Sequence, residues 1–402
     1  MCKATQNQIV LGKLVNEVLT VVVPTMRAHS DVIKTDMANV LLVVTLGTSS
    51  LDLYSKMLSA SFHALPVMPS NIYLVSAGLF GVFALGIKPL KALLSDYRFV
   101  KALNREKAEI VHLPNQHLGR YINFLKKKCV VTIHDLIRFF DMKGHYPPFI
   151  HKPNLRDRIG LELDYRGVRR AEKIIAISKY TKNDLVKRLK VPEEKIDVVY
   201  QGINHTLFKP THNPTPIKEP YILYVGSEQP RKNLSTLLKA FYKLKQGDRR
   251  FNDLKLVKVG NPGKMRSFRK NTLEIIDALN LDKDVVFAGF IPRKELPNYY
   301  SNAECLVLPS LYEGFGRPVV EAMACGCPVI TSNTSSLPEV VGDAGLMVDP
   351  RDVNALENAM KEFLTNGKLR RSMVRKGLQR ASNFSWQKTA KETSEIYKEI
   401  VR

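Results

Sequence analysis

Residues 306–332 read LVLPSLYEGFGRPVVEAMACGCPVITS, and this stretch decides the fold. Its first and last runs, 306–309 and 329–332, are apolar and predict two short buried strands. Between them, Pro318 suits the first turn of a helix, and Gly326 suits a left-handed cap at the end of that helix. A strand, a glycine-containing loop, a helix and a second strand form one βαβ unit. The stretch therefore predicts a parallel sheet covered by helices.

The same alternation of apolar strands and amphipathic helices extends in both directions. Further strands are predicted at 38–44, 72–76, 110–113, 130–133, 173–177, 221–225, 254–259, 285–288 and 346–348, and the strand at 306–309 can begin at Cys305. Residues 202–220 contain four prolines in their last eleven positions, which is typical of a linker. We therefore predict two doubly wound α/β domains, 38–205 and 206–384, that face each other across a cleft. An extension, 1–37, precedes them, and a helix, 385–402, follows and can pack back on the first domain.

Composition narrows the class of protein. The chain has 402 residues, of which 45% are hydrophobic and 25% charged, as in ordinary globular proteins. Lysine and arginine exceed aspartate and glutamate by 61 − 38 = 23, which favours anionic partners. The five cysteines include no CxxC pair, which argues against a zinc site and against a disulfide framework. The N-terminus lacks the pattern of a secretory signal, so we expect a cytoplasmic protein.

One stretch tests the expectation of a soluble protein. Residues 64–87 carry no charge and are long enough to cross a bilayer. Two prolines and three glycines interrupt them. We therefore interpret the stretch as a buried strand, 72–76, followed by a turn and the start of a helix.

The 306–332 stretch also carries chemistry. Gly314 and Gly316 let a ligand approach the backbone, and free N–H groups at the start of the helix can hold a phosphate. Glu313 lies just before that helix and Glu321 lies within it. Glu321 can accept hydrogen bonds from paired hydroxyls, as on a ribose. Taken singly, the two glutamates could equally be a solvated loop carboxylate and an exposed helix position.

Glu313 and Glu321, with seven residues between them, resemble the signature of the retaining glycosyltransferases of family 4, which have the GT-B fold. The similarity continues through 322–329, 334–339, 342–345 and 349–350. It implies two Rossmann-like domains that move a sugar from a nucleotide-diphosphate sugar to a hydroxyl of a glycan or lipid-linked glycan, with retained configuration. It also implies a catalytic Glu313 and a donor site that includes Gly314, Phe315, Gly316 and Glu321. Members usually need no divalent ion, so no metal and no cofactor are expected.

A second cluster lies at the first strand-to-helix junction of the second domain. Gly226 is followed by Arg231 and Lys232, and two cations beside a helix start fit a diphosphate. The resemblance implies that they bind the diphosphate of the donor, with Gly226 beside them. The family's usual arginine after this glycine is Ser227 here, and Arg231 can substitute for it. Two solvated cations are the alternative interpretation.

The first domain contributes fewer candidates. His134 follows the predicted strand 130–133, and the resemblance implies that it faces the donor sugar and the acceptor, as a second catalytic residue. An imidazole at the end of a strand can bond a sugar hydroxyl. A structural histidine bonded to Asp135 is the alternative. Gly47 lies where the family has a glycine-rich donor loop. Arg317 either adds a cation near the phosphates or points to solvent.

Two other classes of function stay open on the sequence alone. One is a glycan phosphorylase-like enzyme, and the other is a basic nucleic-acid-binding protein. No motif of stacked aromatic and basic residues is present, so a nucleic-acid partner is not expected. Cations at 126–128 and 169–170 either hold the first domain against an anionic membrane surface, as in a peripheral membrane enzyme, or form a solvated face.

Overall fold

The computed structural model describes residues 39–46, 50–62, 71–78, 88–145 and 147–401. The predicted extension 1–37 and the candidate Gly47 lie outside these residues. The described chain contains two six-stranded sheets, in which neighbouring strands are parallel. We call them, with the helices that join their strands, the first lobe and the second lobe.

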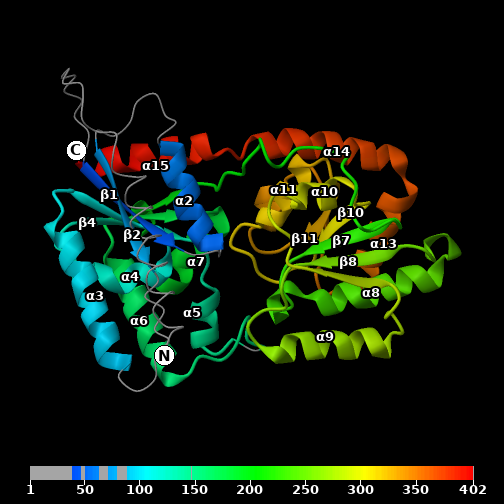
Figure 1. Ribbon diagram of the computed structural model, residues 1–402, viewed down its shortest axis with the longest axis horizontal. Coiled ribbons are helices and arrows are strands. Elements are labelled where there is room, and N and C mark those ends of the chain that lie inside the picture. Colours follow the sequence, from blue (N-terminus) through cyan, green and yellow to red (C-terminus); the bar gives the residue numbers. More distant parts are fainter. Residues whose placement is uncertain (1–38, 47–49, 63–70, 79–87, 146, 402) are drawn as a thin grey trace, which may run out of the picture. The chain divides into compact units, whose positions relative to one another are not determined.

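The sheet of the first lobe has the strand order β2-β1-β3-β4-β5-β6. Three of its strands, β1, β2 and β4, are labelled in Figure 1. Its strands are β1 (Asn39–Leu46), β2 (Asn71–Gly78), β3 (Ile110–Leu113), β4 (Lys128–Ile133), β5 (Lys173–Ala176) and β6 (Ile196–Val198). Its helices are α2 (Ser50–Phe62), α3 (Lys88–Arg105), α4 (Gly119–Ile122), α5 (Ile137–Met142), α6 (Leu155–Arg170) and α7 (Lys179–Leu189). This order is that of a flavodoxin-like sheet, extended by one strand.

The sheet of the second lobe has the order β12-β11-β10-β7-β8-β9. Counted from its own first strand, this is the 3-2-1-4-5-6 order of a Rossmann sheet, in reverse. Its strands are β7 (Tyr221–Val225), β8 (Lys255–Val259), β9 (Val285–Gly289), β10 (Cys305–Leu308), β11 (Val329–Ser332) and β12 (Leu346–Val348). Its helices are α8 (Leu234–Gly247), α9 (Arg266–Ala278), α10 (Leu296–Ser301), α11 (Arg317–Ala324), α12 (Leu337–Val341), α13 (Val353–Thr365) and α14 (Gly367–Ser382).

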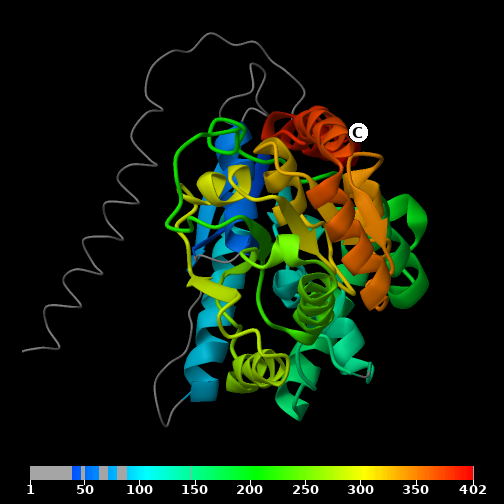
Figure 2. The same ribbon diagram turned by 90° about the vertical axis from the view of Figure 1, so that its right-hand side faces the viewer.

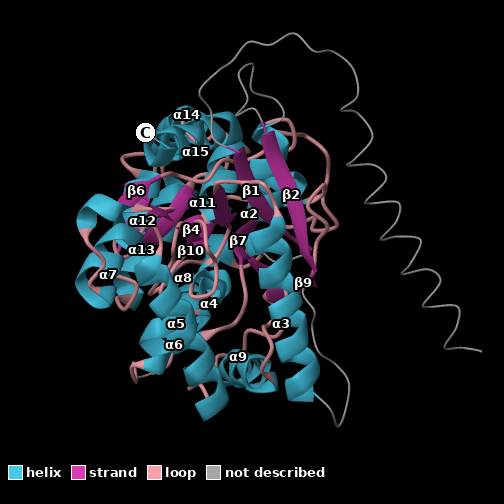
Figure 3. Ribbon diagram, turned by 90° about the vertical axis from the view of Figure 1, so that its left-hand side faces the viewer, coloured by secondary structure: helices cyan, strands magenta, loops and turns pink. Residues whose placement is uncertain are grey.

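The predicted α/β class with doubly wound parallel sheets is confirmed. Helices and strands alternate through both lobes (Figure 3). Helices cover both faces of the sheets, so the central strands are buried, as every residue of β3, β10 and β11 is. The predicted strand at 72–76 is β2, which pairs in parallel with β1. Among the described residues, no helix is both long enough and apolar enough to cross a membrane.

The last helix, α15 (Trp386–Val401), packs on the first lobe although it follows the second lobe in the sequence (red in Figures 1 and 2). Trp386, Ile396 and Tyr397 share one apolar cluster with Tyr54 and Phe62 of α2. The chain crosses between the lobes close to this point, where Ile203 forms an isolated β-bridge with Ser385.

Trp386, the only tryptophan of the chain, makes this contact measurable. Its side chain is buried between α15 and α2, so Trp386→Ala removes a large apolar side chain from a packed cluster. We expect this change to lower the free energy of unfolding by about 3–5 kcal/mol. Urea denaturation followed by circular dichroism measures the loss. Trp386→Phe is the control and should cost less than half as much, and equal losses for the two variants would contradict a specific packing role.

Candidate active site

A cleft of about 410 Å³ lies where the carboxyl ends of strands from both sheets meet. In the first lobe, residues that follow β4, β5 and β6 line the cleft. In the second lobe, the ends of β7 and β8 and the residues after β9 and β10 line it. The polar and charged side chains of the lining are His134, Asp135, Gln201, Arg231, Lys232, Arg293, Glu313, Arg317 and Glu321. Ligands of doubly wound sheets bind at such strand ends, so the cleft is the candidate active site.

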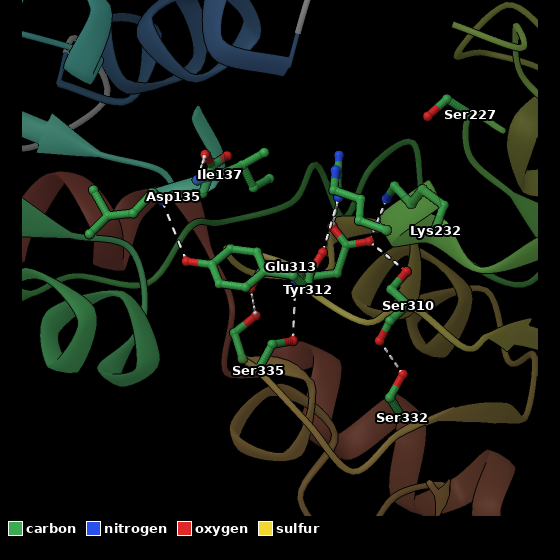
Figure 4. Close-up of polar contacts among 12 residues, drawn as sticks. Asp135, Ile137, Ser227, Lys232, Ser310, Tyr312, Glu313, Ser332 and Ser335 are labelled. Atoms are coloured by element: carbon green, nitrogen blue, oxygen red, sulfur yellow. Dashed lines mark hydrogen bonds and ion pairs between the residues drawn. The ribbon is translucent and has the colours of Figure 1, made fainter. Parts of the chain in front are cut away.

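Glu313 is at the centre of a buried ionic cluster in this cleft (Figure 4). Its Oε1 accepts hydrogen bonds from Lys232 Nζ at 2.5 Å and from Ser310 Oγ at 2.7 Å. Its Oε2 accepts from Arg231 Nη1 at 3.2 Å, and Arg231 Nη1 also donates to the carbonyl of Tyr312 at 3.1 Å. The cations predicted to bind the donor thus lie together on the carboxylate predicted to be catalytic.

Two loops of the second lobe build this cluster. Arg231 and Lys232 belong to a 3₁₀ turn, Pro230–Lys232, that follows β7 and leads into α8. Glu313 follows β10, and its loop is fixed by Ser336 Oγ, which donates to the carbonyl of Glu313 at 2.9 Å. Because β7 and β10 are neighbours in the sheet, the two loops meet at one edge.

Opposing effects set the charge of the cluster. Burial by itself would raise the pKa of Glu313, but Lys232 and Arg231 outweigh it and lower that pKa to about 2. Burial lowers the pKa of Lys232, and Glu313 opposes this shift. The carboxylate is therefore ionised at neutral pH. Arg231 Nε is buried and has no hydrogen-bond partner among the described residues, which leaves a donor at the cleft without an acceptor.

Glu321 is buried rather than exposed on its helix. Its Oε1 accepts from Arg317 Nη2 at 3.0 Å and from Arg293 Nη2 at 3.3 Å, and its Oε2 accepts from the hydroxyl of Tyr300 at 3.1 Å. Arg317 therefore points into the cleft and not to solvent. The Arg293 side chain is 39% exposed, whereas that of Arg317 is 16% exposed, so Arg293 is the easier partner to displace.

The loop between the two glutamates brings backbone to the cleft. A Cβ atom on Gly314 would lie 1.8 Å from the carbonyl oxygen of His134, so glycine is needed for the close approach of the two lobes. Gly316 has φ +94° and is the N-cap of α11, which no side chain caps. Phe315 is buried and lines the cleft. At the start of α11, Pro318 has no N–H group and that of Val319 donates to the carbonyl of Gly316 at 2.9 Å, so the backbone N–H groups of Gly316 and Arg317 are the ones left for an anion.

His134 lines the cleft, but both of its ring nitrogens have partners in the protein. Nε2 donates to the carbonyl of Pro114 at 2.9 Å, and Nδ1 accepts from Gln201 Nε2 at 2.9 Å. Burial lowers the pKa of His134 to about 4, although the bond to Pro114 opposes the shift. The alternative of a bond between His134 and Asp135 is wrong, because Asp135 instead accepts from the backbone N–H of Ile137 at 3.0 Å.

Gly226 lies beside the cleft, next to the lining residue Val225. A Cβ atom on Gly226 would meet the Tyr224 hydroxyl at 3.4 Å and Lys232 Cδ at 3.7 Å, which are ordinary contact distances. The contact of Gly226 with a donor stays a prediction. Ser227 lies apart from the cluster around Glu313 in Figure 4, so Arg231 is the arginine that accompanies Lys232.

Sequence reasoning missed several lining residues. Gln201 and Arg293 act through contacts with His134 and Glu321, which are far away in the sequence. Phe290 lines the cleft with its side chain 71% exposed, an unusual position for an aromatic residue. Arg293 and Phe290 both follow β9, so the rule that ligands bind at the carboxyl ends of strands could have found them.

The buried neutral imidazole of His134 predicts a pH effect on stability. Its folded-state pKa is about 4 and its unfolded value is about 6.5, so the unfolded chain binds more protons between these values. Stability should therefore fall as pH decreases from about 6.5 toward 4. His112, whose pKa burial lowers to about 3, adds to the same trend. Urea midpoints at pH 7 and pH 5 test this, and His134→Gln should reduce the difference. An unchanged difference would contradict the buried neutral state.

Comparison with known proteins agrees with the geometry. The family described as "Glycosyltransferase Family 4" matches residues 71–207, and "Glycosyl transferases group 1" matches residues 208–380. O-antigen chain mannosyltransferase B of Escherichia coli is 30% identical over 315 residues, which cover 76% of this chain and 78% of the relative. MMP alpha-(1->4)-mannosyltransferase of Mycolicibacterium hassiacum is 30% identical over 311 residues, which cover 75% of this chain and 73% of that relative.

Solved structures share the fold. Sucrose-phosphate synthase of Thermosynechococcus elongatus has a TM-score of 0.71 at 22% identity, over 90% of this chain and 99% of that one. HepE of Anabaena, in complex with UDP and glucose, has a TM-score of 0.70 at 16% identity, over 90% of this chain and 99% of that one. The lobes and the cleft define a two-lobed α/β enzyme of the GT-B fold. The chain belongs to the group 1 glycosyltransferases and is a glycosyltransferase, as the resemblance implied.

Proposed function

We propose that this glycosyltransferase moves a sugar from a nucleotide-diphosphate sugar to a hydroxyl of a glycan or lipid-linked glycan, with retention of anomeric configuration and without a divalent metal ion. The observation that carries the proposal is the pairing of Arg231 and Lys232 beside the uncapped start of α11 in one cleft. The names of the relatives, mannosyltransferases among them, support a glycan product.

The diphosphate is the part of the donor that this cluster recognises. Breaking the bond from the sugar to the diphosphate leaves extra negative charge on the phosphate oxygens. Lys232, Arg231 and the N–H groups at the start of α11 would stabilise that charge as it develops. These groups supply the positive charge that a divalent ion would otherwise provide. The Arg231 Nε donor, which has no partner among the described residues, is available to the same oxygens.

Glu313 is the proposed catalytic carboxylate. When the diphosphate takes over Lys232 and Arg231, the ionised Glu313 can turn to the sugar and stabilise the positive charge that builds up at the anomeric carbon. In the empty cleft Glu313 is already ionised at neutral pH, because Lys232 and Arg231 outweigh the effect of burial and lower its pKa to about 2. His134 lies on the opposite wall as a neutral imidazole, and its contact with a sugar hydroxyl requires that Gln201 release Nδ1.

Glu321 is proposed to bind the ribose of the nucleotide. Both of its oxygens already accept hydrogen bonds, so a ribose must displace a partner, and the half-exposed Arg293 is the one that can move. Phe290, largely exposed at the mouth of the cleft, offers a face on which a base can stack.

The proposed setting is the cytoplasmic face of a membrane, with the first lobe on an anionic lipid surface. Two of the lysines expected to face the membrane instead form hydrogen bonds within the protein. Lys127 donates to the carbonyl of Ala108, and Lys128 donates to the carbonyl of Ile400. Helix α6 offers a better surface. Its outer face exposes three apolar side chains four residues apart, Leu155, Ile159 and Leu163. The exposed basic residues of the same helix are Arg156, Arg158, Arg166, Arg169 and Arg170.

Transfer from a panel of nucleotide sugars, mannose donors first, tests the proposed reaction. We expect turnover with one donor class, activity that survives excess EDTA, and a product whose anomeric proton coupling by NMR matches that of the donor. Loss of activity in EDTA would contradict the metal-free step, and inversion would contradict retention.

Vesicle flotation tests the membrane surface. Binding should require anionic lipid and weaken with salt, and Ile159→Ser should reduce it. Equal binding to neutral vesicles would contradict this part.

A further inference from the structure

A second cavity, of about 260 Å³, lies in the first lobe and is lined by residues of α4, α5 and α6. Figure 3 shows these three helices near one another. We call this cavity the basic side pocket. It is lined by His117, Arg120, Arg138, Arg156, Asp157, Gly160, Leu161 and Asp164. None of these residues belongs to the donor cleft, and the proposed reaction does not use them.

One wall of the basic side pocket is rigid. Arg120 donates to Asp164 through Nε at 2.7 Å and through Nη2 at 2.8 Å, a two-bond pairing with a carboxylate that is almost fully buried. Helix α6 lies so close to α4 that a Cβ atom on Gly167 would overlap the carbonyl oxygen of Gly119. A Cβ atom on Gly160 would be 3.3 Å from Arg120 Nη2, so glycine also leaves room for the guanidinium.

The opposite wall is equally well fixed. Arg138 Nη1 donates to Asp141 at 2.8 Å and to the carbonyl of His151 at 2.9 Å. The Asp141 carboxylate is buried and also accepts from the backbone N–H of Phe149 at 2.7 Å. Two guanidinium groups are therefore held in place by buried carboxylates before any ligand arrives.

Hydrogen-bond donors are in excess in the basic side pocket. The carboxylates of Asp164 and Asp141 are engaged by Arg120 and Arg138. Arg156 is exposed and forms no ion pair with any described residue, and His117 approaches Asp164 only at 3.9 Å. Asp157 is the one lining carboxylate without an ion pair among the described residues. A pocket with several donor groups and one such carboxylate matches a ligand group rich in acceptors, such as a phosphate, beside a hydroxyl that can donate to Asp157.

The basic side pocket adjoins the acceptor wall of the cleft. His117 follows Gln116, whose Oε1 accepts from the backbone N–H of the cleft residue His134 at 3.2 Å. Arg138 follows Ile137, which lines the cleft itself. Residues adjacent in the sequence thus contribute to the acceptor wall and to the basic side pocket.

We propose that the basic side pocket binds an anionic group, a phosphate or a carboxylate, of the acceptor, next to the sugar whose hydroxyl reacts. This inference rests on the proposed glycosyl transfer and specifies the class of acceptor. The group can belong to a water-soluble phosphorylated glycan or to a lipid-linked phosphate. The exposed apolar side chains Leu155, Ile159 and Leu163 are on the same helix as Arg156, which favours the lipid source.

Calorimetric titration with inorganic phosphate tests the inference without any transfer reaction. It is done at constant ionic strength with saturating UDP or GDP, so that the cations of the donor cleft are occupied. We expect one phosphate to bind, and Arg156→Gln to weaken it by roughly tenfold. Arg105→Gln is the matched control, an exposed arginine of α3 outside the pocket, and should leave the affinity unchanged. Equal effects of the two variants, or no binding once nucleotide is present, would overturn the inference.

Dodecyl phosphate and mannose distinguish the kinds of ligand. Tighter binding of dodecyl phosphate than of inorganic phosphate, with the gain lost in Ile159→Ser, assigns the site to a lipid phosphate, and equal affinities assign it to a soluble one. Binding of mannose that Arg156→Gln does not change, with no binding of phosphate, would make the pocket a neutral sugar site and overturn the inference. Phosphate binding is measured without a sugar donor. A failure of the proposed transfer reaction can therefore be distinguished from a failure of this inference.

Discussion

Glu313→Gln should lower kcat/KM for sugar transfer by a factor on the order of 10³ while it tightens the binding of the free nucleoside diphosphate about tenfold. Glutamine keeps the shape of the side chain but removes the negative charge that the sugar needs in the transition state. The same change frees Lys232 and Arg231, which Glu313 engages at 2.5 and 3.2 Å in the empty cleft. A diphosphate then binds these cations without competition from a carboxylate.

Steady-state transfer assays and calorimetry with the nucleoside diphosphate measure the two opposite effects. Glu304→Gln is the control, because Glu304 is a carboxylate of the same lobe that pairs with Arg370 and does not line the cleft. It should change neither quantity by more than about twofold. A Glu313→Gln enzyme with more than a tenth of normal activity would contradict the catalytic role. Weaker diphosphate binding in this variant would contradict the competition between Glu313 and the phosphates.

Gly314→Ala should reduce kcat/KM about 100-fold in a protein that still folds. The added Cβ atom would lie 1.8 Å from the carbonyl oxygen of His134 in the opposite lobe, well inside van der Waals contact. Carbon and oxygen atoms rarely approach closer than about 3 Å. The two lobes must therefore separate by more than about 1 Å at this point to relieve the overlap between the Cβ atom and the carbonyl oxygen. A displacement of this size between the donor and acceptor walls is enough for a loss of this order.

Gly247→Ala, at the end of α8, provides the matched control. A Cβ atom there meets only a carboxylate oxygen of Glu357, at 3.8 Å, so transfer should proceed at the normal rate. Circular dichroism and the melting temperature verify that both variants are folded. Normal transfer by Gly314→Ala would show that the contact between the lobes near His134 is not needed in the reacting enzyme.

Most of the fold could be predicted because its signals are local. Strands of such sheets are short and mostly apolar, so β3, β7, β11 and β12 begin and end at the predicted residues. Strand β6 was missed because it is only three residues long, and an aspartate occupies its middle position. Strand order was not predicted, since it depends on contacts between residues far apart in the sequence.

The candidate site was only partly predictable. Glu313, Glu321, Arg231 and Lys232 stand in a recognisable pattern, and the structure places all four in one cleft. Their partners are set by tertiary contacts, so nothing local could show that Arg293 and Tyr300 engage Glu321. Charge was equally hard to interpret, because a lysine run such as 126–128 looks the same whether its ammonium groups face water or satisfy carbonyls of the protein.

The most direct measurement is a crystal structure of the chain with a nucleotide sugar that cannot be transferred, such as a fluorinated donor. We expect diphosphate oxygens within about 3 Å of Lys232 Nζ, the Arg231 guanidinium and the backbone N–H groups of Gly316 and Arg317, with Glu313 turned toward the sugar. A donor bound elsewhere, while Glu313 still holds both cations as in the empty cleft, would contradict this expectation.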